Sequence, residues 1–281
     1  MTLTEFSSRL SFPLDDYQLE ACQHLAEGSG VLVAAPTGAG KTVVGEFAVH
    51  LAVKHRSKCF YTTPIKALSN QKFHDLVAVY GPDKVGLLTG DTVVNSEADI
   101  AVMTTEVLRN MLYAGSPTLR GLEFVVMDEV HYLADPFRGP VWEEVILGLD
   151  PAVKIVGLSA TVSNVEEFGA WLAKIRGDLA TVVSERRPVP LFQHVFAGNR
   201  IIDLFASTAP TAGGGTSKVN PELMKLASGE TRVMRDDSRA YRTRSGRGRP
   251  GSGAQLGGRP HAKYASRSRL VPRRVNVINE L

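Results

Sequence analysis

The chain has few residues of the kinds that form covalent cross-links, structural metal sites or membrane spans. Only two of its 281 residues are cysteines, Cys22 and Cys59, and they lie far apart in the sequence. They provide neither a disulfide framework nor a zinc site, and they favour a reducing compartment. No apolar run approaches the roughly 18 residues of a membrane span, and no secretory signal pattern precedes the first motif. We therefore expect a cytoplasmic protein with no membrane partner.

Charge is distributed unevenly along the chain. Residues 1–202 carry 17 Lys+Arg against 23 Asp+Glu, whereas residues 203–281 carry 15 against 6. Segment 206–271 is rich in Gly, Ser and Arg, so it has too little apolar surface to offset the entropy of folding. We expect a flexible basic linker there. It serves either as a solvated tether or as an arm that contacts nucleic-acid phosphates, and its composition leaves both open.

A glycine-rich turn connects an apolar strand, residues 31–35, to a helical pattern that begins at Lys41. Gly38 and Gly40 let backbone N–H groups point at phosphates, Lys41 reaches the β- and γ-phosphates, and the Thr42 hydroxyl can ligate Mg²⁺. The strict motif begins with glycine, where this chain has Ala35. The turn predicts a nucleoside-triphosphate site formed by Pro36, Thr37, Gly38, Ala39, Gly40, Lys41 and Thr42.

A second motif, Asp128-Glu129-Val130-His131, follows the apolar residues 124–127. Both carboxylates are then expected at the carboxyl end of a buried strand, where open α/β sheets bind ligands, one sheet position from the loop. By itself an Asp-Glu pair is more often a helix cap or surface charge. After a phosphate loop, Asp128 is expected to hold Mg²⁺ and Glu129 to orient or deprotonate water, with His131 sensing the γ-phosphate.

Three weaker signals accompany these motifs. Gln18, just inside a predicted helix over about 17–27, precedes the loop at a spacing that suits recognition of the adenine edge, with Phe12 available to stack. Ser159-Ala-Thr161 ends a later strand, where its hydroxyls are expected to bond His131 or Asp128. Segments 62–68 and 104–109 place hydroxyls and N–H groups at helix starts along one sheet edge, which suits nucleic-acid phosphates or simple helix capping.

Apolar strands and helices alternate along the first two hundred residues. Such a pattern predicts a doubly wound, mainly parallel α/β sheet covered on both faces. The expected strands are 31–35, 58–63, 85–89, 100–104, 124–128, 154–159 and 181–183. The expected helices are 17–27, 41–54, 64–80 (with Pro64 at its first position), 105–113, 141–147 and 165–174.

In combination, these motifs resemble the DEVH-box helicases of superfamily 2, within them the superkiller-type, exosome-associated RNA helicases, and most of all the HelY helicases of actinobacteria. The resemblance covers about residues 6–205. It rests on residues 12–18, 35–42, 61–71, 88–91, 103–111, 128–131, 135–139 with 142–144, and 158–161.

The resemblance implies a RecA-like domain over 1–205 that uses ATP and Mg²⁺ to move 3′-to-5′ on single-stranded RNA or DNA. Phe12 and Gln18 would receive adenine, Thr42 and Asp128 the metal, and RNA-degradation machinery is an implied partner. Ser159 and Thr161 would couple the two sites. The residues implied to face nucleic acid are Thr63, Pro64, Lys66, Thr89, Gly90, Thr104 and Thr105.

The chain departs from the family pattern in its last third. Family members carry a second RecA-like domain whose arginines complete the ATP site, and no Gln-x-x-Gly-Arg-x-x-Arg stretch occurs in this sequence. Residues 272–281 resemble the start of such a domain, truncated. We therefore expect ATP binding with weak hydrolysis. Two alternatives are a nucleotide-sensitive binding module without unwinding activity and a different phosphate-loop translocase.

Overall fold

The structure, a computed structural model, describes residues 2–160, 164–189, 192–197, 200–206 and 218–228. The chain divides into two compact units, Met1–Val189 and Pro190–Leu281. The first unit therefore ends before residue 205, where the sequence predicted the boundary of the first domain.

The first unit is built on an eight-stranded sheet in the order β4-β3-β5-β2-β6-β7-β1-β8. Strands β3 and β4 pair antiparallel, and the other neighbouring strands pair parallel, which confirms the predicted fold class. Strand β7 lies between β1 and β6, so the expectation that the loop strand and the acidic strand are neighbours is wrong. The strands are β1 Gly30–Ala34, β2 Lys58–Thr63, β3 Val85–Leu88, β4 Val93–Val94, β5 Ile100–Thr104, β6 Leu122–Met127, β7 Lys154–Ser159 and β8 Leu179–Val183.

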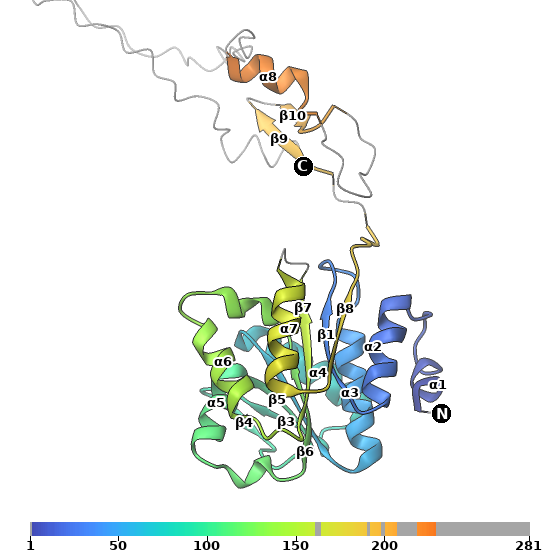
Figure 1. Cartoon of the computed structure of the whole chain (residues 1–281), viewed down its shortest axis with the longest axis vertical. Coiled ribbons are helices and arrows are strands. Elements are labelled where there is room, and N and C mark those ends of the chain that lie inside the picture. The colour runs from blue at the N-terminus through green and yellow to red at the C-terminus, as the bar shows by residue number, and fades with distance from the viewer. Residues whose placement is uncertain (1, 161–163, 190–191, 198–199, 207–217, 229–281) are drawn as a thin grey trace, which may run out of the picture. The chain divides into compact units, whose positions relative to one another are not determined.

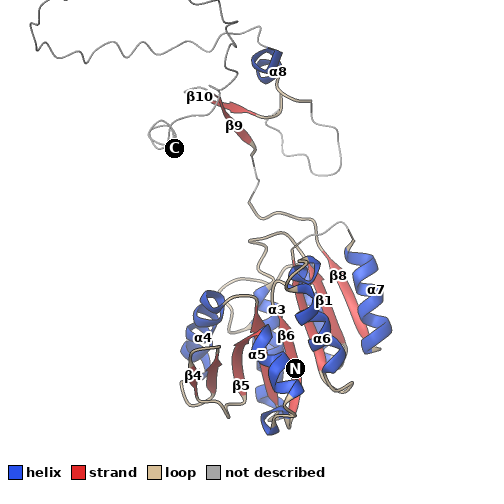
Figure 2. Ribbon diagram, turned by 90° about the vertical axis from the view of Figure 1, so that its left-hand side faces the viewer, coloured by secondary structure: helices blue, strands red, loops and turns tan. Residues whose placement is uncertain are grey.

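Helices cover both faces of this sheet, as Figure 1 and Figure 2 show. Alternate residues of a strand point to opposite faces, so Val31 and Val33 pack in one apolar layer while Leu32 and Ala34 pack in the other. The first layer is covered by α1 Thr2–Ser7, α2 Asp16–Ala26, α3 Thr42–His55 and α4 Lys66–Tyr80. The second is covered by α5 Thr105–Tyr113, α6 Gly139–Gly148 and α7 Val165–Arg176.

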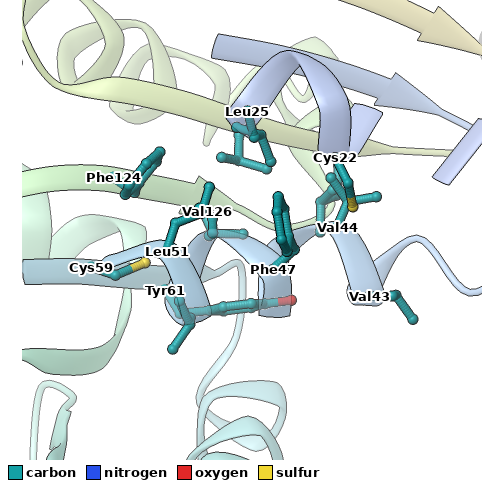
Figure 3. Packing of buried hydrophobic residues seen from close by; sticks show 14 of the residues in the cluster. Cys22, Leu25, Val43, Val44, Phe47, Leu51, Cys59, Tyr61, Phe124 and Val126 are labelled. Atoms are coloured by element: carbon teal, nitrogen blue, oxygen red, sulfur yellow. The ribbon is translucent and has the colours of Figure 1, made fainter. Parts of the chain in front are cut away.

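Helix α3 lies unusually close to the sheet. In Figure 3 its Phe47 and Leu51 pack with Tyr61 of β2 and Val126 of β6. The approach requires glycine at Gly45, since a Cβ there would lie 3.0 Å from both Tyr61 Cε2 and Val126 Cγ1. The helix that begins at the phosphate loop is thereby fixed against the strand that leads to Asp128.

The predicted and observed boundaries agree fully for four elements. Strands 58–63, 100–104 and 154–159 and helix 105–113 occur as predicted. The start of α4 was predicted wrongly, because Pro64 precedes the helix and Ile65 is its N-cap. A local turn explains the difference: the Thr63 hydroxyl donates to the Ile65 carbonyl at 3.0 Å, which delays the helix to Lys66.

The second unit contains an antiparallel pair, β9 His194–Ala197 and β10 Arg200–Asp203, and helix α8 Pro221–Ser228. Helix α8 falls within 206–271, so the prediction of a flexible linker throughout this segment is wrong at these residues. Here Pro221 starts a short run with Leu223 and Leu226 at helical spacing, unlike the Gly- and Arg-rich remainder. Residues 207–217 and 229–281, with the predicted domain start at 272–281, lie outside the described residues.

A short 3-10 helix, η2 Val130–Ala134, leads from the acidic pair into a tight turn before α6. A Cβ at Gly139 would lie 2.2 Å from the Leu133 carbonyl oxygen, so an added methyl forces the backbone apart. We expect Gly139→Ala to lower the free energy of unfolding by about 1–3 kcal/mol, measured by urea denaturation. Gly148→Ala is the matched control in the same helix, because its Cβ would meet Leu112 at an ordinary 3.5 Å. An equal loss in both variants would contradict this prediction.

Candidate functional site

The predicted phosphate loop connects β1 to α3 and closes around its own lysine. Gly38 and Gly40 have φ angles of 83° and 84°, a left-handed conformation that favours glycine. Lys41 is 7% exposed, and its Nζ donates to the carbonyl oxygens of Ala35 at 2.9 Å and Pro36 at 3.2 Å. The ammonium is therefore held at the loop in a defined position.

Gln18 joins the start of α2 to this loop. Its Oε1 accepts from the Asp15 N–H at 2.9 Å, and its Nε2 donates to the Gly40 carbonyl at 3.0 Å. The side chain is 3% exposed, and Phe12 is 48% exposed. Sequence analysis predicted an amide free to meet an adenine edge, whereas here the amide bonds the loop. The neighbouring Tyr17 hydroxyl donates to the Ala39 carbonyl, a contact that sequence analysis missed because no motif marks it.

The acidic pair follows β6 in an unusual backbone conformation. Glu129 has φ 56° and ψ 42°, a left-handed conformation that costs a non-glycine residue about 1–3 kcal/mol. Asp128 Oδ1 accepts from the Glu129 N–H at 3.0 Å, and its Oδ2 accepts from the Tyr61 hydroxyl at 3.1 Å. Both carboxylate oxygens are thus oriented by neighbouring donors.

The lysine and the two carboxylates follow strands that end at the same edge of the sheet, and the carboxylate charges act on the lysine. Burial lowers the pKa of Lys41, and the nearby charges of Glu129 and Asp128 oppose that shift. Burial raises the pKa of Asp128, as does Glu129, while the Tyr61 hydrogen bond acts in the opposite direction. Burial likewise raises the pKa of Tyr61 well above its usual range. The two motifs predicted from sequence therefore meet at the carboxyl ends of β1 and β6, across β7.

His131 lies between the acidic pair and the end of β7. Its Nδ1 is 3.2 Å from Glu129 Oε2 and 3.5 Å from the Ala160 amide nitrogen. One contact requires a proton on Nδ1 and the other an unprotonated Nδ1, so each tautomer makes only one of them. Sequence analysis predicted a link through hydroxyls, but Ser159 Oγ donates to the Ala160 carbonyl at 2.8 Å. Thr161 lies outside the described residues.

The predicted nucleic-acid residues do gather at the carboxyl ends of β2, β3 and β5, but several hydroxyls are engaged within the chain. Thr63 Oγ1 bonds the Ile65 carbonyl and Ser69 Oγ, and Thr105 Oγ1 donates to the Thr63 carbonyl at 3.5 Å. Both threonines are buried. In this structure both hydroxyls therefore bond within the chain, and the expectation that Thr63 and Thr105 face nucleic acid stays a prediction.

The other members of this set divide between buried and exposed. Thr104 and Pro64 are buried, and Thr89 is buried with its hydroxyl donating to Asp91 Oδ1 at 3.0 Å. Gly90 and Lys66 are exposed, although the Lys66 ammonium pairs with Asp91 at 2.8 Å. Among the predicted nucleic-acid residues, Lys66 and Gly90 are accordingly the two that are accessible to solvent.

The turn after η2 connects the acidic pair to this edge. Asp135 Oδ1 accepts from the N–H groups of Phe137 and Arg138, and the Arg138 Nη1 donates to the Pro64 carbonyl at 3.1 Å. Residues 135–139 carry part of the family resemblance, but the sequence pattern predicts no role for Arg138. The contact spans 74 residues of sequence, so local pattern does not reveal it.

The residues at the site fit a magnesium ion carried by a nucleotide. Thr42 is exposed at the start of α3, and the Asp128 carboxylate supplies oxygen, which are the hard ligands that Mg²⁺ takes. Within the described residues, no group of three or more His, Cys, Asp or Glu side chains is arranged to hold a metal ion by itself. Mg²⁺ commonly keeps most of its coordination for phosphates and water and takes only one or two protein ligands.

A lysine held in a glycine turn and faced by two strand-end carboxylates, on a doubly wound sheet, defines a P-loop nucleotide-binding domain with a RecA-like fold. The sequence profile of the DEAD/DEAH box helicases matches residues 15–168. The chain belongs to this family.

Relatives place the chain more closely within that family. The probable helicase HelY of Mycobacterium tuberculosis (strain ATCC 25618 / H37Rv) is 60% identical over 249 residues, which are 89% of this chain and 27% of the relative. Superkiller complex protein 2 of Homo sapiens is 50% identical over 190 residues, 67% of this chain and 15% of the relative. The chain thus spans about a quarter or less of the length of these two relatives.

A solved structure supports the fold. The structure of Mycobacterium smegmatis helicase Lhr bound to ssDNA and AMP-PNP matches with a TM-score of 0.53 and 28% sequence identity, over 68% of this chain and 28% of that one.

Within the described part of the chain, no helix combines the length and the apolar character needed to cross a membrane.

Proposed function

We propose that this chain is the ATP-binding motor lobe of an ATP-dependent helicase that moves 3′-to-5′ on single-stranded RNA or DNA. One observation carries the proposal most: Lys41, which follows β1, and the Asp128 and Glu129 carboxylates, which follow β6, lie at the same edge of the sheet, and the two carboxylates raise the pKa of Lys41 against the effect of burial. A phosphoryl-transfer site needs this combination of a phosphate-binding cation, a metal ligand and a base.

Each residue then has a distinct task. The N–H groups of residues 37–40 bind the phosphates, and Lys41 contacts the β- and γ-phosphates. Thr42 and Asp128 hold Mg²⁺, which when bound neutralises charge on the phosphates. Glu129 orients the attacking water and accepts its proton, and His131, in contact with Glu129 Oε2, responds to the change.

Coupling to nucleic acid is proposed to run along two connections. The Ala160 N–H contacts His131, which supports a role for residues 159–161 in transmitting the nucleotide state. Arg138 contacts the Pro64 carbonyl, so a shift of the turn after η2 reaches the predicted nucleic-acid edge. At that edge the exposed Lys66 and Gly90 and the helix N-termini are the proposed phosphate contacts.

A second candidate is a nucleotide-sensitive binding module without unwinding activity. Residues 1–281 include no Gln-x-x-Gly-Arg-x-x-Arg stretch to supply an arginine finger, which contributes roughly 10³–10⁵ in rate, so we expect slow hydrolysis from this polypeptide on its own. The superkiller-complex name of the human relative supports RNA-degradation machinery as a proposed partner. A cytoplasmic location completes the proposal.

We expect the polypeptide 1–281 to bind ATP and to hydrolyse it weakly. The measurement is a coupled-enzyme ATPase assay on the purified protein with no nucleic acid, with single-stranded RNA and with single-stranded DNA, beside a fluorescent-ATP binding assay. Rapid turnover by 1–281, at the level of a complete helicase, contradicts weak hydrolysis. Absence of nucleotide binding contradicts the proposed function itself. The direction of translocation is tested separately, by measuring the unwinding of duplexes with 3′ or 5′ single-stranded tails by a longer polypeptide that includes a second RecA-like lobe.

A further inference from the structure

Tyr61 is a buried tyrosine whose hydroxyl reaches the candidate site from within the apolar layer. It lies on β2 within the apolar layer under α3, as Figure 3 shows. The residue is 0% exposed. A buried tyrosine hydroxyl requires a polar partner. Its partner is Asp128 Oδ2 on β6, 3.1 Å away and 67 residues later in the sequence.

The Tyr61 ring has two close neighbours besides Asp128. Gly45 of α3 lies so close that an added Cβ would be 3.0 Å from Tyr61 Cε2. The Lys72 ammonium lies 5.3 Å from the ring centroid, a cation–π distance, and pairs with Glu46 Oε1 at 2.9 Å. Lys72 is itself buried. These contacts restrict the orientation of the ring and therefore the position of its hydroxyl.

The two bonds to Asp128 leave its carboxylate oriented but not saturated. Oδ1 accepts from the Glu129 N–H and Oδ2 from the Tyr61 hydroxyl. A carboxylate oxygen has two acceptor sites, so each atom retains one for a further ligand. Outer-shell partners of this kind fix the orientation of a metal ligand and commonly change metal affinity by about 10–100-fold when lost.

We propose that Tyr61, packed against α3 and the Lys72 ammonium, is a positioning residue that orients the Asp128 carboxylate for the magnesium of bound Mg·ATP. This inference rests on the proposed function. Tyr61 is fully buried and acts through Asp128 rather than by touching the nucleotide. Because α3 begins at the phosphate loop, the same ring also fixes the distance between the metal ligand and the loop.

The test is Tyr61→Phe, which removes one oxygen and retains the ring. A fluorescent ATP analogue is titrated with the protein in EDTA, and Mg²⁺ is then titrated at fixed nucleotide while anisotropy is recorded. We expect the Mg²⁺ concentration for half-maximal enhancement of binding to rise about tenfold or more, with affinity in EDTA within about twofold of wild type. Tyr80→Phe is the matched control, because Tyr80 packs against the same layer at the far end of α4.

The outcomes separate the inference from the function it rests on. An unchanged Mg²⁺ requirement in Tyr61→Phe, with wild type showing clear Mg²⁺ dependence, overturns the positioning role alone. Wild-type protein that binds no nucleotide, or binds it without regard to Mg²⁺, overturns both. If thermal unfolding shows that Tyr61→Phe does not fold, Lys72→Met decides instead: it removes the cation behind the ring, and an unchanged Mg²⁺ requirement overturns the proposal.

Discussion

Replacement of Glu129 by glutamine is expected to slow ATP hydrolysis by about a hundredfold to ten thousandfold while Mg·ATP still binds. The amide has nearly the shape of the carboxylate but cannot accept the proton of the attacking water, and a general base contributes about this factor. The left-handed backbone at residue 129 and the Glu129 N–H bond to Asp128 involve main-chain atoms, so the exchange leaves both in place.

Two measurements make this prediction specific. Single-turnover phosphate release reports the chemical step, and fluorescent-nucleotide titration reports binding. Glu143→Gln is the matched control, since Glu143 is an exposed glutamate of α6. A Glu129→Gln protein that retains more than about a tenth of wild-type hydrolysis would show that another group takes the proton, and His131, in contact with the Glu129 carboxylate, is then the group to replace next.

The sequence pattern predicts well at which edge of the sheet the site lies, because the positions of the strand ends follow from the periodicity of apolar residues. A buried parallel strand must end at one edge of the sheet, so apolar runs followed by Ala35-to-Thr42 and by Asp128-Glu129 place the two motifs on the same edge. What the pattern leaves open is the strand order. Nothing in the local sequence states that β7 inserts between β1 and β6, because lateral order is set by how crossover helices pack.

The side-chain partners are harder to predict than the edge at which the site lies. Thr63 and Thr105 look like phosphate ligands at helix starts, yet the Thr63 hydroxyl bonds Ile65 and Ser69 in the turn that follows it, and the Thr105 hydroxyl reaches the Thr63 carbonyl on the neighbouring strand. Gln18 suits an adenine edge by spacing, yet its amide reaches the Gly40 carbonyl. For Thr105 and Gln18 the competing partner lies on another segment, so the choice depends on distances that only tertiary packing sets.

Replacement of Lys41 by alanine is expected to weaken ATP binding by about thirtyfold or more. Removal of one member of a buried, hydrogen-bonded charge interaction commonly costs 2–5 kcal/mol, at about 1.4 kcal/mol for each factor of ten. Two consequences add up here. The phosphates lose a cation, and the Ala35 and Pro36 carbonyls lose the donor that closes the loop around them, so the loop is also less ordered before ATP arrives.

The size and shape of the cation decide whether charge alone is sufficient. Lys41 sits almost fully buried between two carbonyl oxygens, a position that suits a compact ammonium and not the planar fork of a guanidinium. We therefore expect Lys41→Arg to bind ATP nearly as weakly as Lys41→Ala in fluorescent-nucleotide titrations. Lys54→Ala is the matched control near the other end of α3, where an exposed lysine pairs with Glu5 and contributes little. Full affinity in Lys41→Arg would mean that the loop opens to admit the larger group and that positive charge, rather than the carbonyl cradle, determines binding.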